Sequence, residues 1–334
     1  MFKVGAPPRP QRKTIMKRYI STIIAAATLT AGAQIFEVQS VEPITLPAGL
    51  LQTQVAVISH DGSFALLTDD TYNGLARLDL ASGAAEVITT ATGAGIDPSL
   101  SADDSHVAFR DVTYSETHRR MTAVQVADLS TRQLTRVVPP SREVQAVAIS
   151  GEMAVAVVAG QPARRAIARP GSTSRPDGAR AAAPSASAER PVLSIAGEQL
   201  MITRGGTTTL LSPCGTDGCS YIWPSLSPSG KRVMFYLVGR GIYTCNLDGS
   251  NLRFVADLHA PVWYSDDVIV AMNDIDGHDT QVSSEIVALR LSDGERQTLC
   301  GGSDLIAMYP VANAATRRIA FTTRDGAPHL ITLR

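Results

Sequence analysis

The residues most suited to chemistry form an acidic stretch, NDIDGHD, which runs from Asn273 to Asp279. The carboxylates of Asp274, Asp276 and Asp279, with His278 beside them, could hold Ca²⁺ or another hard cation. The spacing is not that of an EF-hand, because a loop counted from Asp274 has Asp279 at its sixth position, where that motif needs a glycine. The sequence favours an acidic loop between two strands, with no cofactor, and leaves Ca²⁺ binding as the alternative.

Other familiar catalytic and binding patterns are absent from the sequence. There is no G-x-S-x-G nucleophile elbow and no H-E-x-x-H zinc motif, and the six histidines are scattered. A net charge of −1 gives no electrostatic basis for binding nucleic acid. The sequence therefore leans away from an enzyme, and we expect no nucleic-acid partner.

The elements that must position any such residues are short antiparallel strands. Between Trp223 and Val255 the chain alternates β-branched and aromatic runs with turn residues, and Asp248-Gly249 is a strong hairpin signal. A single sheet of this size cannot bury both faces, so further copies should pack beside it.

Six segments share this pattern of a short strand, a polar turn and a second strand. Five first strands end in serine and the sixth ends in Asn313; the serines are Ser59, Ser101, Ser150, Ser227 and Ser265. The segments recur at roughly 45 residues, the length of a four-stranded propeller blade, except across one longer interval. The sequence therefore predicts an all-β, six-bladed β-propeller with four-stranded antiparallel blades.

The stretch SPSGKRVMFYLVGRGIYTCNLDGS, from Ser227 to Ser250, resembles the WD40-like repeat of TolB-type β-propellers. That pattern has Ser-Pro-Asp-Gly, a strand ending in phenylalanine, a tyrosine and a final Asp-Gly; here Ser229 replaces the usual aspartate. The resemblance implies a fold rather than an activity, because propellers host many functions.

Two further segments complete the predicted ring. Gln161 to Arg190 is rich in Ala, Arg, Pro and Ser, and predicts a flexible surface insertion within a single propeller domain spanning residues 34–334. Val41 to Leu46 (VEPITL) predicts an outer strand of the last blade, which would close the ring and remove two sheet edges.

A propeller places the start of each blade's first strand at the mouth of its central channel. Asp97, Trp223 and Tyr309 occupy this position, together with the apolar residues Val55, Ala146 and Pro261. Two aromatic faces and one carboxylate suit a ligand-binding funnel. Packing of Trp223 and Tyr309 between blades is the alternative.

The beginning of the sequence predicts export. Lys17 and Arg18 precede an apolar run from Ile20 to Leu29, and Ala31-Gly32-Ala33 is a small-residue cleavage site, so residues 1–33 predict a signal peptide, with Met16 as the favoured start. We expect a periplasmic or secreted monomer with no membrane span. In such a compartment, Cys214 and Cys219 predict a local disulfide, with Cys245 and Cys300 as buried thiols.

Two functions remain open on the sequence alone. The first is a non-catalytic propeller of the bacterial envelope that binds another envelope protein or a small ligand. The second is a small propeller hydrolase or lyase that acts on a carbohydrate or lactone, with Asp97 and the NDIDGHD loop supplying its acidic and metal-binding groups. The second requires both groups to lie at the same end of the ring.

Overall fold

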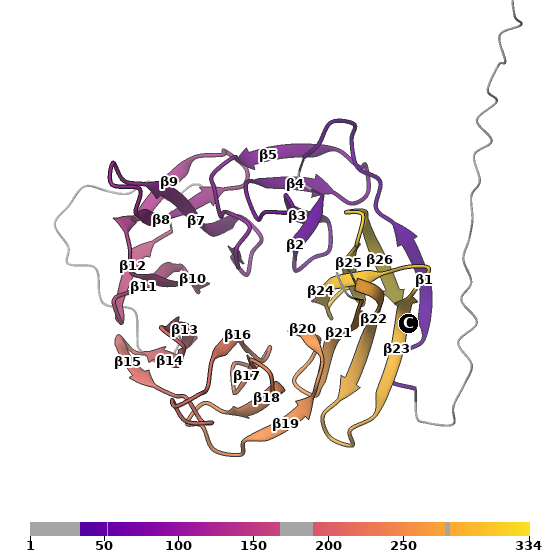
Figure 1. Ribbon diagram of the computed structural model, residues 1–334. Helices are drawn as coiled ribbons and strands as arrows, with labels where there is room; N and C mark the ends of the chain where they lie inside the picture. The colour runs from indigo at the N-terminus through magenta and orange to yellow at the C-terminus, as the bar shows by residue number, and fades with distance from the viewer. Residues whose placement is uncertain (1–33, 52, 168–189, 278–280) are drawn as a thin grey trace, which may run out of the picture.

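The computed structural model describes residues 34–51, 53–167, 190–277 and 281–334. In this part of the chain, the strands form seven small antiparallel sheets. Figure 1 shows the sheets arranged around a central axis like the blades of a propeller. The all-β propeller is therefore confirmed, but the prediction of six blades was wrong.

The first three blades follow the chain in order. Blade 1 contains β2 (Gln54–Ile58), β3 (Phe64–Thr68), β4 (Leu75–Asp79) and β5 (Ala85–Thr89). Blade 2 contains β6 (Ser99–Leu100), β7 (His106–Tyr114), β8 (Arg120–Asp128) and β9 (Leu134–Ser141). Blade 3 contains β10 (Val144–Ser150), β11 (Met153–Val158) and β12 (Gln161–Ala166).

The remaining blades complete the ring. Blade 4 contains β13 (Val192–Ala196), β14 (Gln199–Arg204) and β15 (Thr207–Leu210). Blade 5 contains β16 (Tyr221–Leu226), β17 (Arg232–Leu237), β18 (Gly241–Asn246) and β19 (Arg253–Ala256). Blade 6 contains β20 (His259–Trp263), β21 (Val268–Asp276), β22 (Gln281–Arg290) and β23 (Arg296–Gly302). Blade 7 contains β24 (Ala307–Asn313), β25 (Arg318–Thr323), β26 (Pro328–Leu333) and β1 (Val38–Pro43).

Blade 4 is the blade that the repeat pattern failed to reveal. It lies within the long interval between Ser150 and Ser227. Its inner strand ends in Ala196 rather than serine, and the pair Ala196↔Gln199 leaves the two-residue turn Gly197-Glu198, which resembles the turn Gly151-Glu152 of blade 3. Blades 3 and 4 each have three strands in the described residues, whereas the other five have four.

The predicted insertion is divided by the structure. Its first six residues form β12, which pairs with β11 from Val158↔Gln161 to Met153↔Ala166. Residues 168–189 lie outside the described residues, as does the predicted signal peptide at 1–33. None of the described segments forms an apolar helix long enough to span a membrane.

The ring is closed by the N-terminal strand. β1 is the outermost strand of blade 7 and pairs antiparallel with β26, from Val38↔Leu333 to Pro43↔His329. The strand begins three residues earlier than the predicted segment Val41 to Leu46. Pro43 is tolerated because the outer edge of a blade does not need its missing N–H.

The hydrophobic core is a series of clusters between neighbouring blades. Leu66 and Leu75 of blade 1 pack with Val107 and Phe109 of blade 2. Equivalent clusters join blades 5 and 6, blades 6 and 7, and blades 7 and 1. The second strands, such as β3 and β25, are almost wholly buried because a blade covers each of their faces. Each fully buried Leu or Phe contributes roughly 1.5–3 kcal/mol of transfer free energy.

The aligned serines have a structural role. The hydroxyl oxygen of Ser101 accepts a hydrogen bond from the His106 N–H at 2.9 Å, and that of Ser59 accepts one from the Phe64 N–H at 3.0 Å. Each hydroxyl also donates to the aspartate two residues later, Asp103 or Asp61. These buried side chains therefore fix the turn between the first and second strands of a blade.

The predicted disulfide is not formed, and all four cysteines are free thiols. The hydroxyl group of Tyr221 closes the loop that the disulfide was expected to close. It accepts from the Cys214 N–H at 2.7 Å and donates to the Gly215 carbonyl at 2.9 Å.

Candidate functional site

Because the strands of each blade are antiparallel, the two ends of the ring carry different strand ends and turns. One end carries the start of every inner strand and the hairpin turn between the second and third strands; we call it the hairpin end. Asp97, Trp223 and Tyr309 lie at this end, and so does Asp274 near the end of β21. The aligned serine turns lie at the opposite end. Asp97 and Asp274 therefore lie at the same end of the ring, which is the first condition of the enzyme alternative.

At this end the inner strands have an unusual backbone. Asp97, Trp223, Ala260 and Tyr309 have positive φ angles of 46°, 50°, 44° and 52°, and each precedes a proline. In β16, β20 and β24 the strand register shifts at this dipeptide. A non-glycine residue with positive φ is uncommon, and a bulge re-aims the side chain.

The bulges leave two large aromatic side chains open to solvent. Trp223 is 44% exposed and Tyr309 is 37% exposed, although both lie within inner strands. Both were predicted at the channel mouth. The structure adds that Ala260, not Pro261, is the equivalent residue in blade 6, because the positive φ falls on the residue before the proline.

Trp223 begins a cluster that crosses from blade 5 to blade 6. Its ring centroid lies 5.4 Å from that of Tyr236, which lies 5.4 Å from the ring of His259. The Nδ1 atom of His259 lies 2.6 Å from Oδ1 of Asp274. We call Trp223, Tyr236, His259 and Asp274 the aromatic–histidine cluster.

The charge of Asp274 influences tyrosines on both sides of blade 6. Burial raises the pKa of Tyr236, and the carboxylates of Asp257 and Asp274 raise it further. Burial also raises the pKa of Tyr309, with added contributions from Tyr72 and Asp274. Both phenols therefore stay protonated at neutral pH, and that of the partly exposed Tyr309 can donate a hydrogen bond to a ligand.

The cluster offers stacking surfaces and a few oriented polar groups. The side chain of Asp274 is only 6% exposed, whereas that of His259 is 40% exposed. A buried carboxylate at Nδ1 fixes the orientation of the imidazole and leaves Nε2 as its second hydrogen-bonding atom. The arrangement can orient a ligand, and an imidazole held in this way can also act as a general base.

The predicted metal ligands do not gather in the described part of the chain. No group of three histidine, cysteine or acidic side chains there is placed to hold a metal ion. Asp274 contacts His259 instead, and Asp276 follows at the end of the same strand. His278 and Asp279 lie outside the described residues, so the Ca²⁺ alternative stays a prediction.

Asp97 belongs to a different part of the hairpin end. Its charge acts on Arg110 of blade 2, where it raises the arginine pKa against the larger lowering caused by burial. Sequence reasoning missed Tyr236, His259 and Arg110, because their proximity to the channel mouth depends on how blades meet. The X-Pro dipeptides at the starts of the inner strands were the available signal, since proline within a sheet marks a bulge or an edge.

Comparisons with known proteins support the fold and leave the function open. No protein-family model and no curated protein matches the sequence. The putative TolB of Agrobacterium tumefaciens superposes with a TM-score of 0.52 at 16% identity, covering 88% of this chain and 96% of that chain. The WD40 repeats of RRP9 superpose with a TM-score of 0.59 at 8% identity, covering 88% and 97%.

TolB of Acinetobacter baumannii is also similar, with a TM-score of 0.48 at 15% identity. The alignment covers 79% of this chain and 55% of that one, so the chain spans about half of that protein. The superpositions on the Agrobacterium tumefaciens protein and on the RRP9 repeats confirm, at the level of fold, the resemblance to TolB and WD40 propellers that the repeat predicted.

Proposed function

We propose that this protein is a non-catalytic binding module of the bacterial envelope, and that its hairpin end is the binding surface. The observation that carries the proposal is the exposure of Trp223 and Tyr309 on positive-φ bulges. Such a backbone conformation costs roughly 1–3 kcal/mol per residue, and residues that adopt it cluster at functional sites. Placement in the envelope rests on the predicted signal peptide.

The chemistry of the cluster indicates the kind of ligand. Exposed indole and phenol rings suit the flat face of a sugar ring or an apolar side chain of a partner protein. The phenol group of Tyr309 and the imidazole of His259 add hydrogen bonds that fix the orientation of the bound group. A WD40-like fold is compatible with either ligand and selects neither.

The test compares the chain from Gln34 onward with a Trp223→Ala variant in a pull-down from envelope extract and on an immobilised glycan panel. We expect the variant to lose binding to the protein or glycan that the unaltered chain binds, while its free energy of unfolding changes by no more than about 1 kcal/mol. Phe254→Ala is the matched control, because Phe254 is 56% exposed on the outer strand β19. Unchanged binding with a large loss of stability would show that Trp223 serves only in packing.

The His259–Asp274 pair gives the hydrolase or lyase alternative a specific basis. In that case His259 would act as a general base oriented by Asp274, which lies 2.6 Å away. The two functions separate in one variant, His259→Gln. Turnover of an oligosaccharide or lactone by the unaltered chain, abolished in the variant while binding persists, would establish an enzyme; absence of turnover with intact binding supports the binding module.

A further inference from the structure

A cavity lies at the hairpin end where blades 2 and 3 meet, three blades around the ring from the aromatic–histidine cluster. It has a volume of about 510 Å³ and is lined by four arginines, Arg110, Arg119, Arg120 and Arg142, together with Ile96, Thr122 and Val144. We call it the arginine pocket. Its size falls in the range of small-molecule sites.

The pocket exists because blade 2 carries a long hairpin. β7 and β8 have nine residues each, whereas the equivalent strands of blade 1, β3 and β4, have five. The extra length lets the strands pair as far as Tyr114↔Arg120. Arg119 and Arg120 therefore stand at the tip of this hairpin, and Arg142 approaches from the connection to blade 3.

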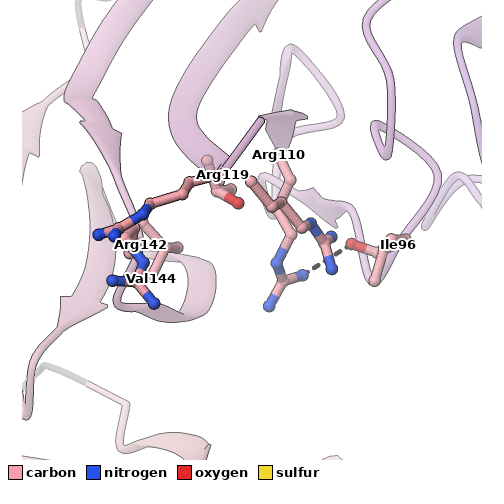
Figure 2. Close-up of a pocket in the computed structure, with 7 residues that line it drawn as sticks. Ile96, Arg110, Arg119, Arg142 and Val144 are labelled. Carbon is pink, nitrogen blue, oxygen red and sulfur yellow. Dashed lines mark hydrogen bonds between the residues drawn. The ribbon is translucent and has the colours of Figure 1, made fainter. Parts of the chain in front are cut away.

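Arg110 is the fixed member of the group. Its Nη1 donates to the Ile96 carbonyl at 2.8 Å, and its Nη2 lies 3.4 Å from the Gln145 carbonyl of blade 3. Figure 2 draws Arg110 and this bond to Ile96 on one side of the pocket, with Arg119 and Arg142 on the other. Two backbone contacts hold the guanidinium group across the junction of the two blades.

The positive charge of the pocket is poorly compensated. Within the described residues, the guanidinium groups of Arg119, Arg120 and Arg142 form no ion pair and no hydrogen bond. Asp97 is the acidic group that acts on Arg110, while Arg120 repels it. Glu116 and Glu143 are neighbours in sequence, but in the described part of the chain neither forms an ion pair with the four arginines. Four clustered cations are unusual in a chain whose net charge is −1.

We propose that the arginine pocket binds a small ligand that carries two or more oxyanion groups, as phosphate or carboxylate. Guanidinium groups present paired N–H donors that match the oxygens of both, and such charge-assisted bonds are the strong ones. The ligand would neutralise the repulsion among the arginines. The Thr122 hydroxyl and the Val144 side chain provide one polar and one apolar wall.

The test is calorimetric titration of the chain from Gln34 onward with pyrophosphate, citrate and inorganic phosphate at constant ionic strength. We expect saturable binding of pyrophosphate or citrate that is tighter than binding of monophosphate and weakens as salt is added. The two multivalent probes distinguish a phosphate ligand from a carboxylate ligand. Absence of saturable binding of either would overturn the proposal.

Variants separate a built site from general attraction of anions. Arg119→Gln and Arg142→Gln remove exposed side chains, so the fold should persist, and each should weaken binding about tenfold. Arg253→Gln on β19 is the matched control, because it removes the same charge from an exposed residue of another blade. An equal loss of binding affinity in all three variants would show that anions are attracted nonspecifically by the net charge and would overturn the proposal.

Discussion

The serine and aspartate of the repeat turn act at a different end of the ring from the candidate site. Ser101 and Asp103 illustrate the arrangement: the aspartate accepts from the hydroxyl groups of Ser101 and Ser105, each at 2.6 Å. These hydrogen bonds lower the pKa of Asp103 to about 2. The most repetitive residues of this chain therefore stabilise the fold, while the residues that vary between blades form the candidate site.

The lowered pKa of Asp103 gives a pH prediction. The ionised carboxylate is favoured in the folded chain, so its contribution to stability is complete above the ordinary pKa of 3.8 and is lost as the pH falls toward about 2. We expect the Asp103→Asn variant to be less stable than the unaltered chain at neutral pH, and to lose less stability as the pH falls from 3.8 to about 2. Urea unfolding at a series of pH values measures both effects. Parallel curves for the two proteins would contradict the assignment.

Among the elements, β23 depends on an unusual glycine. Gly301 has a φ of 110° and pairs with Glu285, and a Cβ atom there would lie 2.4 Å from the Ser284 carbonyl oxygen. Gly302 has a φ of 129° but open space around its Cα. The two neighbours therefore separate backbone strain from a steric clash.

We expect Gly301→Ala to lower the free energy of unfolding by about 2–4 kcal/mol, and Gly302→Ala by about 1 kcal/mol. Denaturant unfolding of the two variants measures the difference. Equal effects would mean that the strand adjusts to the added methyl group and that only the positive φ matters.

The N-terminal strand makes more contacts than its six residues alone suggest. The rings of Phe36 and Tyr264 lie 4.6 Å apart in an edge-on arrangement, and the side-chain oxygen of Gln297 accepts from the Ile35 and Phe36 N–H groups. Val38 and Val41 pack on the core between blades 6 and 7. The strand therefore joins two blades as well as completing one.

Removal of this strand should destabilise the ring strongly. We expect the free energy of unfolding of a chain that begins at Pro47 to be about 3–5 kcal/mol lower than that of a chain that begins at Gln34. The shorter chain should therefore unfold at a lower denaturant concentration. Gln297→Ala should have a smaller effect, since it removes only the side-chain contacts to residues 35 and 36. The same midpoint and slope for both chain lengths would show that β1 does not close the ring.

At the scale of the whole molecule, the sequence predicted the fold but miscounted its blades. Propeller architecture follows from strand periodicity and turn residues, which are local properties. Blade 4 was missed because its inner strand ends in Ala196, without the aligned serine that marked most of the other blades. The placement of Trp223 and Tyr309 at the hairpin end could be predicted, because position within a repeat predicts position in the ring.

The partners of these residues could not be predicted in the same way. Tyr236 approaches Trp223 within one blade, but His259 reaches Tyr236 across a blade junction. The arginine pocket depends on the length of the β7–β8 hairpin and on how blade 3 packs beside it. Such contacts are set by the packing of whole sheets, to which the spacing of residues in one repeat gives no guide.

The pairing of β1 with β26 also has a consequence for the order of assembly. Val38 of β1 pairs with Leu333 of β26, so β1 can pair only after the C-terminal strand is present. Blades 1 to 6 are each formed from consecutive strands. Contacts so distant in sequence form slowly, because the loop must close first. Because β1 pairs last, we expect that it can be supplied as a separate peptide. A synthetic peptide of residues 34–46 should therefore restore stability to a chain that begins at Pro47, measured as a rise in its melting temperature that a scrambled peptide does not produce.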